Sequence, residues 1–163
     1  MRVIVFVLVL VLGGAAALPR QQELGLPLGM KAPSAVLQTL DGKDVDLGSY
    51  IGKGPVVIEF WATWCENCRE LEPALLKAVK KYEGKVTFIG VAVSVQQSPD
   101  RVKSYVAKHG IVHTILYDTH GNATGAYDVP ATSYVVVINK KGLISYTGVG
   151  GDQDLETAIK RGL

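Results

Sequence analysis

Apolar residues follow two different periods in the middle of this chain. They form a nearly continuous run over residues 55–61 and again over residues 85–95, which is typical of strands buried on both faces. Between these runs, residues 66–82 carry apolar side chains at helical spacing, so that these side chains share one face. They belong to Leu71, Leu75, Ala78, Val79 and Tyr82. The pattern therefore predicts a strand, a helix and a second strand in this order.

Turn and capping residues divide the rest of the chain into shorter elements. Asp41-Gly42 separates two short runs and predicts a hairpin. Ser98 and Pro99 suit the N-cap and the first turn of a helix that Gly110 ends. We expect strands at 35–40, 43–47, 111–117, 132–138 and 143–147, and helices at 99–109, 123–127 and 152–160. Strands that alternate with helices predict an α/β fold with a central mixed sheet and helices on both faces.

The first 17 residues differ from the rest of the chain. Arg2 is their only charged residue, and Val3 to Leu12 is unbroken apolar sequence. The apolar run is shorter than the roughly 20 residues that span a bilayer, and Ala15-x-Ala17 suits a signal-peptidase site. We expect 1–17 to be a signal peptide, or alternatively an N-terminal anchor, followed by a linker (18–32) and a single domain (33–163). The domain is then extracytoplasmic, in a compartment such as the bacterial periplasm where disulfides persist.

Composition and charge narrow the class of partner. The chain has 163 residues, 48% of them hydrophobic and 20% charged, which is room for one globular domain. A formal net charge of +2 is too small to indicate nucleic acid or an anionic surface as a partner. We expect no nucleic-acid partner and a monomeric protein.

The only two cysteines, Cys65 and Cys68, lie where the predicted central strand gives way to the predicted helix. Unpaired N–H groups and the helix dipole favour a thiolate at the first of these positions. A thiol one helical turn later can attack the mixed disulfide that the first cysteine forms. The spacing predicts that Cys65 is the nucleophile and Cys68 the resolving thiol of a redox-active disulfide.

Other uses of a Cys-x-x-Cys pair fit the sequence less well. A zinc site needs about four ligands and the pair supplies two, whereas covalent haem attachment needs His where Arg69 stands. A purely structural disulfide across three positions would close too small a loop to constrain the unfolded chain much. We therefore expect no metal and no cofactor besides the disulfide itself.

The residues around the pair carry a family resemblance. Residues 54–65, which read GPVVIEFWATWC, resemble thioredoxin-like proteins, and specifically the exported TlpA/ResA-like thiol–disulfide oxidoreductases. The resemblance runs from Ala32-Pro33 through Pro73 to Gly148 and covers roughly residues 30–163. It implies a thioredoxin fold with an N-terminal β-hairpin extension and a ping-pong exchange of disulfides.

The resemblance also assigns a substrate-binding region. The loop at Val129-Pro130 resembles the family's cis-proline loop, so Pro130 is expected to be cis and to lie against the cysteine pair. The backbone of Val129 would then be free to pair with an extended substrate segment. Trp64 is expected at the rim of the site, where it contacts a partner, and Trp61 in the core.

Glu59 is the single charge in the central strand. A buried carboxyl is unfavourable unless it is neutral or paired. Thioredoxin has an acid at the matching position, six residues before the first cysteine, whereas many TlpA/ResA-like proteins carry Glu three residues after the second, where Leu71 stands here. We predict that Glu59 has a raised pKa and takes the proton of Cys68. The alternative is a strand-end Glu that reaches water.

The pair of residues between the cysteines indicates the direction of electron flow. Glu66 disfavours a thiolate at Cys65, and Asn67 replaces a proline common at this place. A less stabilised thiolate favours the disulfide form, so we expect a reductase. The resemblance implies disulfide-containing protein substrates, with apocytochrome c as the family's best-known one, and a membrane thiol reductant for recycling.

Two alternatives from other classes stay open. A thiol peroxidase usually has Thr three residues before its nucleophile, where this chain has Ala62, with Thr63 one place off. A copper-binding chaperone of this broad fold tends to use CxxxC and a His, one residue longer than the spacing here.

Overall fold

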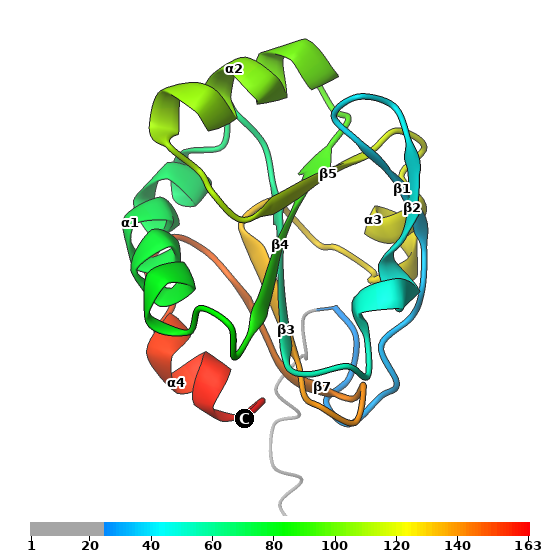
Figure 1. Cartoon of the computed structure of the whole chain (residues 1–163), viewed down its shortest axis with the longest axis vertical. Coiled ribbons are helices and arrows are strands. Elements are labelled where there is room, and N and C mark those ends of the chain that lie inside the picture. The colour runs from blue at the N-terminus through cyan, green and yellow to red at the C-terminus, as the bar shows by residue number, and fades with distance from the viewer. Residues whose placement is uncertain (1–24) are drawn as a thin grey trace, which may run out of the picture.

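A seven-stranded mixed sheet forms the centre of the fold (Figure 1). The structure is a computed structural model that describes residues 25–163. The expected signal peptide or anchor, and the first part of the expected linker, therefore lie outside the described residues. The strands are β1 (Val36–Thr39), β2 (Asp44–Asp46), β3 (Val56–Trp61), β4 (Thr87–Val93), β5 (Thr114–Asp118), β6 (Tyr134–Ile138) and β7 (Ile144–Val149). The helices are η1 (Leu47–Tyr50), α1 (Glu66–Lys81), α2 (Pro99–His109), α3 (Asn122–Ala126) and α4 (Leu155–Lys160).

The strand order is β2-β1-β5-β4-β3-β6-β7. Strands β3, β4 and β5 are parallel to one another, and β6, β7 and the β1–β2 hairpin pair antiparallel to their neighbours. All six residues of β3 are buried, as its continuous apolar sequence predicts. The helices α1 and α4 cover one face and α3 lies on the other (Figure 1). The predicted α/β fold, a mixed sheet with helices on both faces, is confirmed.

Capping residues set the helix boundaries. The Ser98 side chain accepts a hydrogen bond from the Arg101 N–H, and Gly110 adopts a left-handed φ of 62° at the end of α2, as predicted. The closing helix begins later than the predicted residue 152, because the Asp154 side chain accepts the Thr157 N–H at 3.0 Å and acts as its N-cap. Pro73 lies inside α1.

The segment before the domain is attached to the sheet. The Gly29 N–H donates to the Ile144 carbonyl at 2.7 Å, and the Ile144 N–H donates to the Met30 carbonyl at 2.8 Å. Ala32 is buried, and Leu26 packs against the core. Gly29 and Met30, in the described part of the expected linker, therefore pair with the start of β7.

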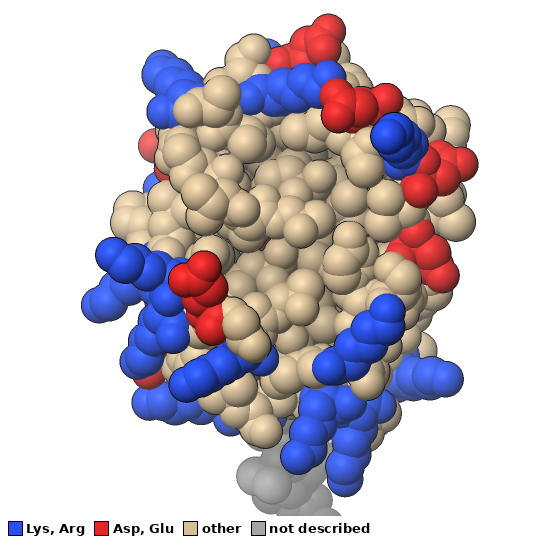
Figure 2. Space-filling view, viewed as in Figure 1, with Lys and Arg blue, Asp and Glu red and all other residues tan. Residues whose placement is uncertain are grey.

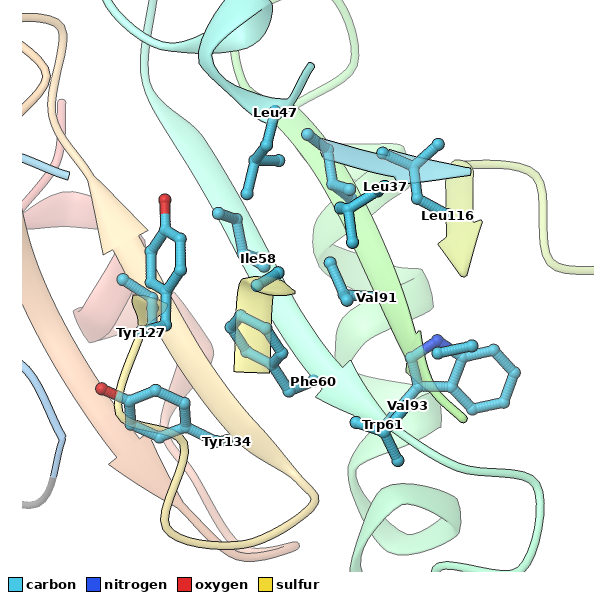
Figure 3. Packing of buried hydrophobic residues seen from close by; sticks show 14 of the residues in the cluster. Leu37, Leu47, Ile58, Phe60, Trp61, Val91, Val93, Leu116, Tyr127 and Tyr134 are labelled. Atoms are coloured by element: carbon cyan, nitrogen blue, oxygen red, sulfur yellow. The ribbon is translucent and has the colours of Figure 1, made fainter. Parts of the chain in front are cut away.

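Aromatic side chains fill the core beneath the α3 face (Figure 3). The Phe60 ring lies 5.4 Å from the Tyr127 ring and 6.0 Å from the Tyr134 ring, between centroids. Burial of one such ring contributes about 2–3 kcal/mol, and the Tyr127 hydroxyl donates to the Pro33 carbonyl at 2.9 Å. This packing holds β3, which leads directly to the cysteine pair, against β6.

Charged side chains lie mostly around the rim of the face seen in Figure 2, and uncharged side chains fill its middle. A groove of about 560 Å³ lies between α1 and the starts of β4 and β5, with Val79, Val86, Phe88 and Val112 among the residues that line it. Within residues 25–163, no helix combines the length and the hydropathy needed to cross a membrane.

Candidate active site

The cysteine pair lies at the first turn of α1. Cys65 is the N-cap residue, and its Sγ accepts the Cys68 N–H at 3.1 Å. The two residues form a disulfide with their Cα atoms 5.3 Å apart. Both are buried, with 4% and 6% of their surface exposed. The structure thus places the pair at the predicted junction of strand and helix, where unpaired N–H groups favour a thiolate on Cys65.

The turn that leads to Cys65 is held by the loop between β4 and α2. The Thr63 N–H donates to the Gln97 side-chain oxygen at 2.9 Å, and the Gln97 amide donates in turn to the Val93 carbonyl. The Tyr117 hydroxyl fixes the same loop through the Gln97 carbonyl at 2.7 Å. Sequence reasoning missed Gln97, because nothing in its local sequence indicates a contact 34 residues away.

The two tryptophans lie in different environments. Trp64 is 38% exposed beside Cys65, and its indole N–H donates to the Val95 carbonyl at 2.8 Å. Val95 is itself 57% exposed, so the two side chains form an apolar rim. Trp61 is buried against the Tyr105 ring, as predicted for a core residue.

Glu59 is buried in the sheet with 7% of its surface exposed, so the alternative of a solvent-reaching Glu does not hold. Burial raises the pKa of Glu59 to about 8, and the negative charge of Glu72 adds to the effect. Glu59 and Cys68 line the same small cavity, of about 10 Å³. The structure thus brings Glu59 and Cys68 to one cavity, and the role of Glu59 as proton acceptor for Cys68 stays a prediction.

The prediction for Pro130 is wrong in its geometry. Residues 25–163 contain no cis peptide bond, so Pro130 is trans, and it is exposed. The Val129 N–H, expected to be free for a substrate, donates to the Thr124 carbonyl at 3.0 Å. The Val129 N–H is occupied because Val129 closes the turn after α3. Three residues then separate Pro130 from the start of β6. Substrate binding by Pro130 stays a prediction without this support.

Ser133 takes the place beside the end of β3. Its N–H donates to the Phe60 carbonyl at 2.8 Å, and its hydroxyl donates to the Gly150 carbonyl at 2.9 Å. Its own carbonyl accepts from the Gly150 N–H and the Gln153 amide. Ser133 is fully buried at a φ of +61°, an uncommon conformation for a residue with a side chain. The pairing of β6 with β3 ends at Tyr134 and Phe60, next to Ser133.

Two histidines to which the sequence assigned no role lie near Glu59 and its neighbour Glu72. His113 lines the cavity that Glu59 and Cys68 share, and burial lowers the pKa of His113 to about 4. His109 lies 2.8 Å from a Glu72 oxygen. Both come from the α2–β5 segment, far from the cysteines in sequence, so only the fold brings them together. In the described part of the chain, no three or more His, Cys, Asp or Glu side chains are grouped so as to hold a metal ion.

Comparison with known proteins identifies the family. The family model described as Redoxin matches residues 27–160. The chain is 32% identical over 131 residues to "Thioredoxin-like protein YneN" of Bacillus subtilis (strain 168), covering 80% of this chain and 76% of that protein. It is 33% identical over 116 residues to "Thiol-disulfide oxidoreductase ResA" of the same organism, covering 71% of this chain and 64% of that protein.

A solved structure is similar to this chain in both fold and sequence. The thiol:disulfide interchange protein, a thioredoxin family protein from Chlorobium tepidum TLS, superposes with a TM-score of 0.70 at 26% identity. The match covers 82% of this chain and 96% of that one. With its cysteine pair at the start of α1, the chain belongs to the Redoxin family, as a thioredoxin-like thiol–disulfide oxidoreductase of the TlpA/ResA type.

Proposed function

We propose that this oxidoreductase is an exported protein-disulfide reductase, in which Cys65 attacks the substrate, Cys68 resolves the mixed disulfide and Glu59 accepts the Cys68 proton. The observation that carries the proposal is the cavity in which the Cys68 side chain and the buried, high-pKa Glu59 meet. A general base needs a pKa near the working pH, and Glu59 satisfies this condition.

The chemistry follows in two exchanges. The Cys65 thiolate attacks one sulfur of a substrate disulfide and forms a mixed disulfide, and the other substrate sulfur leaves as a thiolate. Cys68 then loses its proton to Glu59 and attacks the Cys65 sulfur. The Cys65–Cys68 disulfide forms, the second substrate thiolate leaves, and the substrate has gained two electrons.

The direction of electron flow rests on the first turn of α1. Glu66 is the acidic residue of this turn and places a negative charge beside Cys65. Like charge disfavours the thiolate, which makes the dithiol a better electron donor. A reductase is the direction that this arrangement favours.

The sequence and the family support a proposal for the compartment and the partners. The apolar segment 1–17 supports export, either as a cleaved signal peptide or as an anchor. An exported reductase needs electrons from the membrane, so we propose a membrane thiol reductant as its recycling partner. We propose disulfides of exported proteins as substrates, with apocytochrome c in cytochrome c maturation as the first to test. We propose a monomer that uses no cofactor besides its disulfide.

The equilibrium redox potential of the Cys65–Cys68 pair, measured against glutathione or dithiothreitol, tests the direction. A value near or below about −270 mV supports a reductase, whereas a value near about −120 mV indicates a disulfide donor. Insulin reduction, hydrogen peroxide consumption and copper content should be measured on the same protein. Peroxide consumption without insulin reduction would favour the thiol peroxidase, and bound copper without either activity the copper chaperone.

A further inference from the structure

Glu72 links the cysteine helix to α2. It lies one helical turn after Cys68, and its side chain is 21% exposed. One carboxylate oxygen accepts the Tyr105 hydroxyl at 3.0 Å, and the other lies 2.8 Å from Nδ1 of His109. The Tyr105 and His109 rings stack with their centroids 3.8 Å apart. Both oxygens of Glu72 are therefore held in place by side chains of a neighbouring helix.

Glu72 also faces the cavity of the resolving cysteine. Cys68, Glu59, Glu72 and His113 all line it, and its volume of about 10 Å³ is the space of about one water molecule. The charge of Glu72 acts on Glu59, so the two carboxyls are electrostatically coupled. Glu59 itself is almost closed to solvent.

Because Glu59 is almost closed to solvent, its proton needs a carrier to leave the cavity during turnover. Because the pKa of Glu59 is about 8, its carboxyl carries a proton at neutral pH and must lose it before it can accept the one from Cys68. The polar groups that line the cavity with Glu59 are those of Cys68, Glu72, Tyr105, His113 and Trp61. Arg69 acts on Tyr105, and His109 lies against Glu72.

We propose that Glu72, held by Tyr105 and His109, carries the proton between Glu59 and solvent. The inference rests on the proposed role of Glu59 as proton acceptor. The proton passes from the Glu59 carboxyl to the Glu72 carboxylate, and from there to the His109 imidazole, whose side chain is 26% exposed. Glu72 does not touch the reacting sulfurs in this scheme, so it is a positioning residue that acts through Glu59.

The neighbouring groups are poorer carriers. Burial and the hydrogen bond to Glu72 raise the pKa of Tyr105 to about 12, so its hydroxyl stays protonated and only donates to Glu72. The low pKa of His113 keeps its imidazole neutral, and its Nδ1 has no hydrogen-bond partner among residues 25–163. Glu72 is left as the carboxylate that touches both the cavity and a partly exposed base.

The test compares Glu72→Gln with Glu70→Gln, which removes the same charge from an exposed position of the same helix. The plateau rate of single-turnover oxidation by excess disulfide peptide measures the attack by Cys68. We expect Glu72→Gln to slow this plateau about tenfold, a fraction of what a general base contributes, and Glu70→Gln to leave it unchanged. Glu72→Gln should also lower the pKa of Glu59, measured by carboxyl ¹³C NMR of the oxidised protein, because a negative charge has been removed. A lower pKa leaves more Glu59 ionised at neutral pH, so a slower plateau would reflect the lost proton carrier and not a smaller amount of ionised Glu59.

His109→Gln separates proton transfer from positioning. Glutamine can still donate to Glu72 but cannot carry a proton at neutral pH, so we expect the plateau rate to fall. The pKa of Glu59 should stay near its wild-type value, because the negative charge of Glu72 is kept. The proposal is overturned if Glu72→Gln changes only the melting temperature, or if the Glu59 titration and the plateau rate both match wild type. If Glu59→Gln itself leaves the plateau rate unchanged, the proposed acceptor role fails; the NMR titration needs no turnover and still reports the coupling of Glu59 and Glu72.

Discussion

Two buried polar residues near the end of β3, Glu59 and Ser133, have opposite hydrogen-bonding environments. The Glu59 carboxyl faces the α1–α2 side, where no side-chain or backbone donor among residues 25–163 binds it, and its pKa rises to about 8. Ser133, on the β6 side, has its N–H, hydroxyl and carbonyl all hydrogen-bonded. A group that must gain and lose a proton is left without fixed partners, whereas a group that shapes the backbone is fully bonded. The proton chemistry therefore lies on the Glu59 side of β3, which we call the acid side. The fixed backbone lies on the Ser133 side, which we call the rigid side.

The largest expected effect is that of Glu59→Gln. In the folded protein Glu59 holds its proton up to about pH 8, whereas in the unfolded chain it ionises near its usual 4.5. Between these values the folded state binds more protons, so the free energy of unfolding falls as pH rises, by roughly 3–5 kcal/mol in total. The variant lacks this loss and should be more stable than wild type at pH 9 and similar to it at pH 4, as measured by urea unfolding.

The same variant should also slow the resolving step, the attack of Cys68 on the mixed disulfide. We expect the attack of Cys68 to slow about 100-fold, the lower range for a general base. Glu83→Gln, an exposed change of the same kind, is the control and should alter neither quantity. If the free energy of unfolding of the wild type does not fall between pH 5 and pH 9, the pKa of Glu59 is not raised by folding and the comparison fails.

Gly90→Ala tests how tightly the acid side is packed. Gly90 pairs with Glu59 across the sheet, and a Cβ there would lie 2.6 Å from the Ile115 Cδ1 and 2.9 Å from the Trp61 Nε1. Overpacking of this kind costs about 1–3 kcal/mol, so the variant should unfold at lower denaturant concentration. Gly125→Ala is the matched control, because a Cβ there meets nothing within 4 Å. Equal stability of the two variants would mean that the acid side has more free space than the structure shows.

Ser133→Ala addresses the rigid side. It removes the hydroxyl bond to the Gly150 carbonyl and should cost about 1 kcal/mol, measured as a shift of the unfolding midpoint. Because Ser133 carries no titrating group, the pH dependence of unfolding and of the resolving step should match wild type. A changed pH profile in this variant would show that the two sides are coupled rather than separate.

Much of the acid side could be predicted from local sequence. The apolar run ends where the helical spacing begins, and this junction alone places the cysteines at a helix start. Glu59 stood out because it is the single charge in a strand buried along its whole length. Burial of that strand then raises its pKa by the same physics that made the residue conspicuous.

Glu72 and Ser133 could not be predicted in this way. The family comparison directed attention to the third residue after Cys68, which is Leu71. In α1 that residue points into a separate apolar cluster with Val57, whereas the next residue, turned by about 100°, faces α2. The loop before β6 likewise contains a proline at a familiar spacing, but the pairing of β3 with β6 brings Ser133 beside Phe60. Tertiary register, which no local pattern encodes, decides both positions.

The smallest expected effect lies at the rim, where the acid side meets solvent. Trp64→Phe keeps an apolar ring beside Cys65 but loses the indole bond to the Val95 carbonyl. A half-exposed hydrogen bond of this kind contributes about 0.5–1.5 kcal/mol, so the stability loss should be small. If Trp64 and Val95 form a surface that contacts the substrate, KM for a protein disulfide should rise about threefold to tenfold, equivalent to a loss of about 0.7–1.4 kcal/mol of binding free energy, while the plateau rate of Cys68 attack stays unchanged. A variant that slows the plateau instead would place Trp64 in the support of the cysteine turn, beside Gln97, and not at a docking surface.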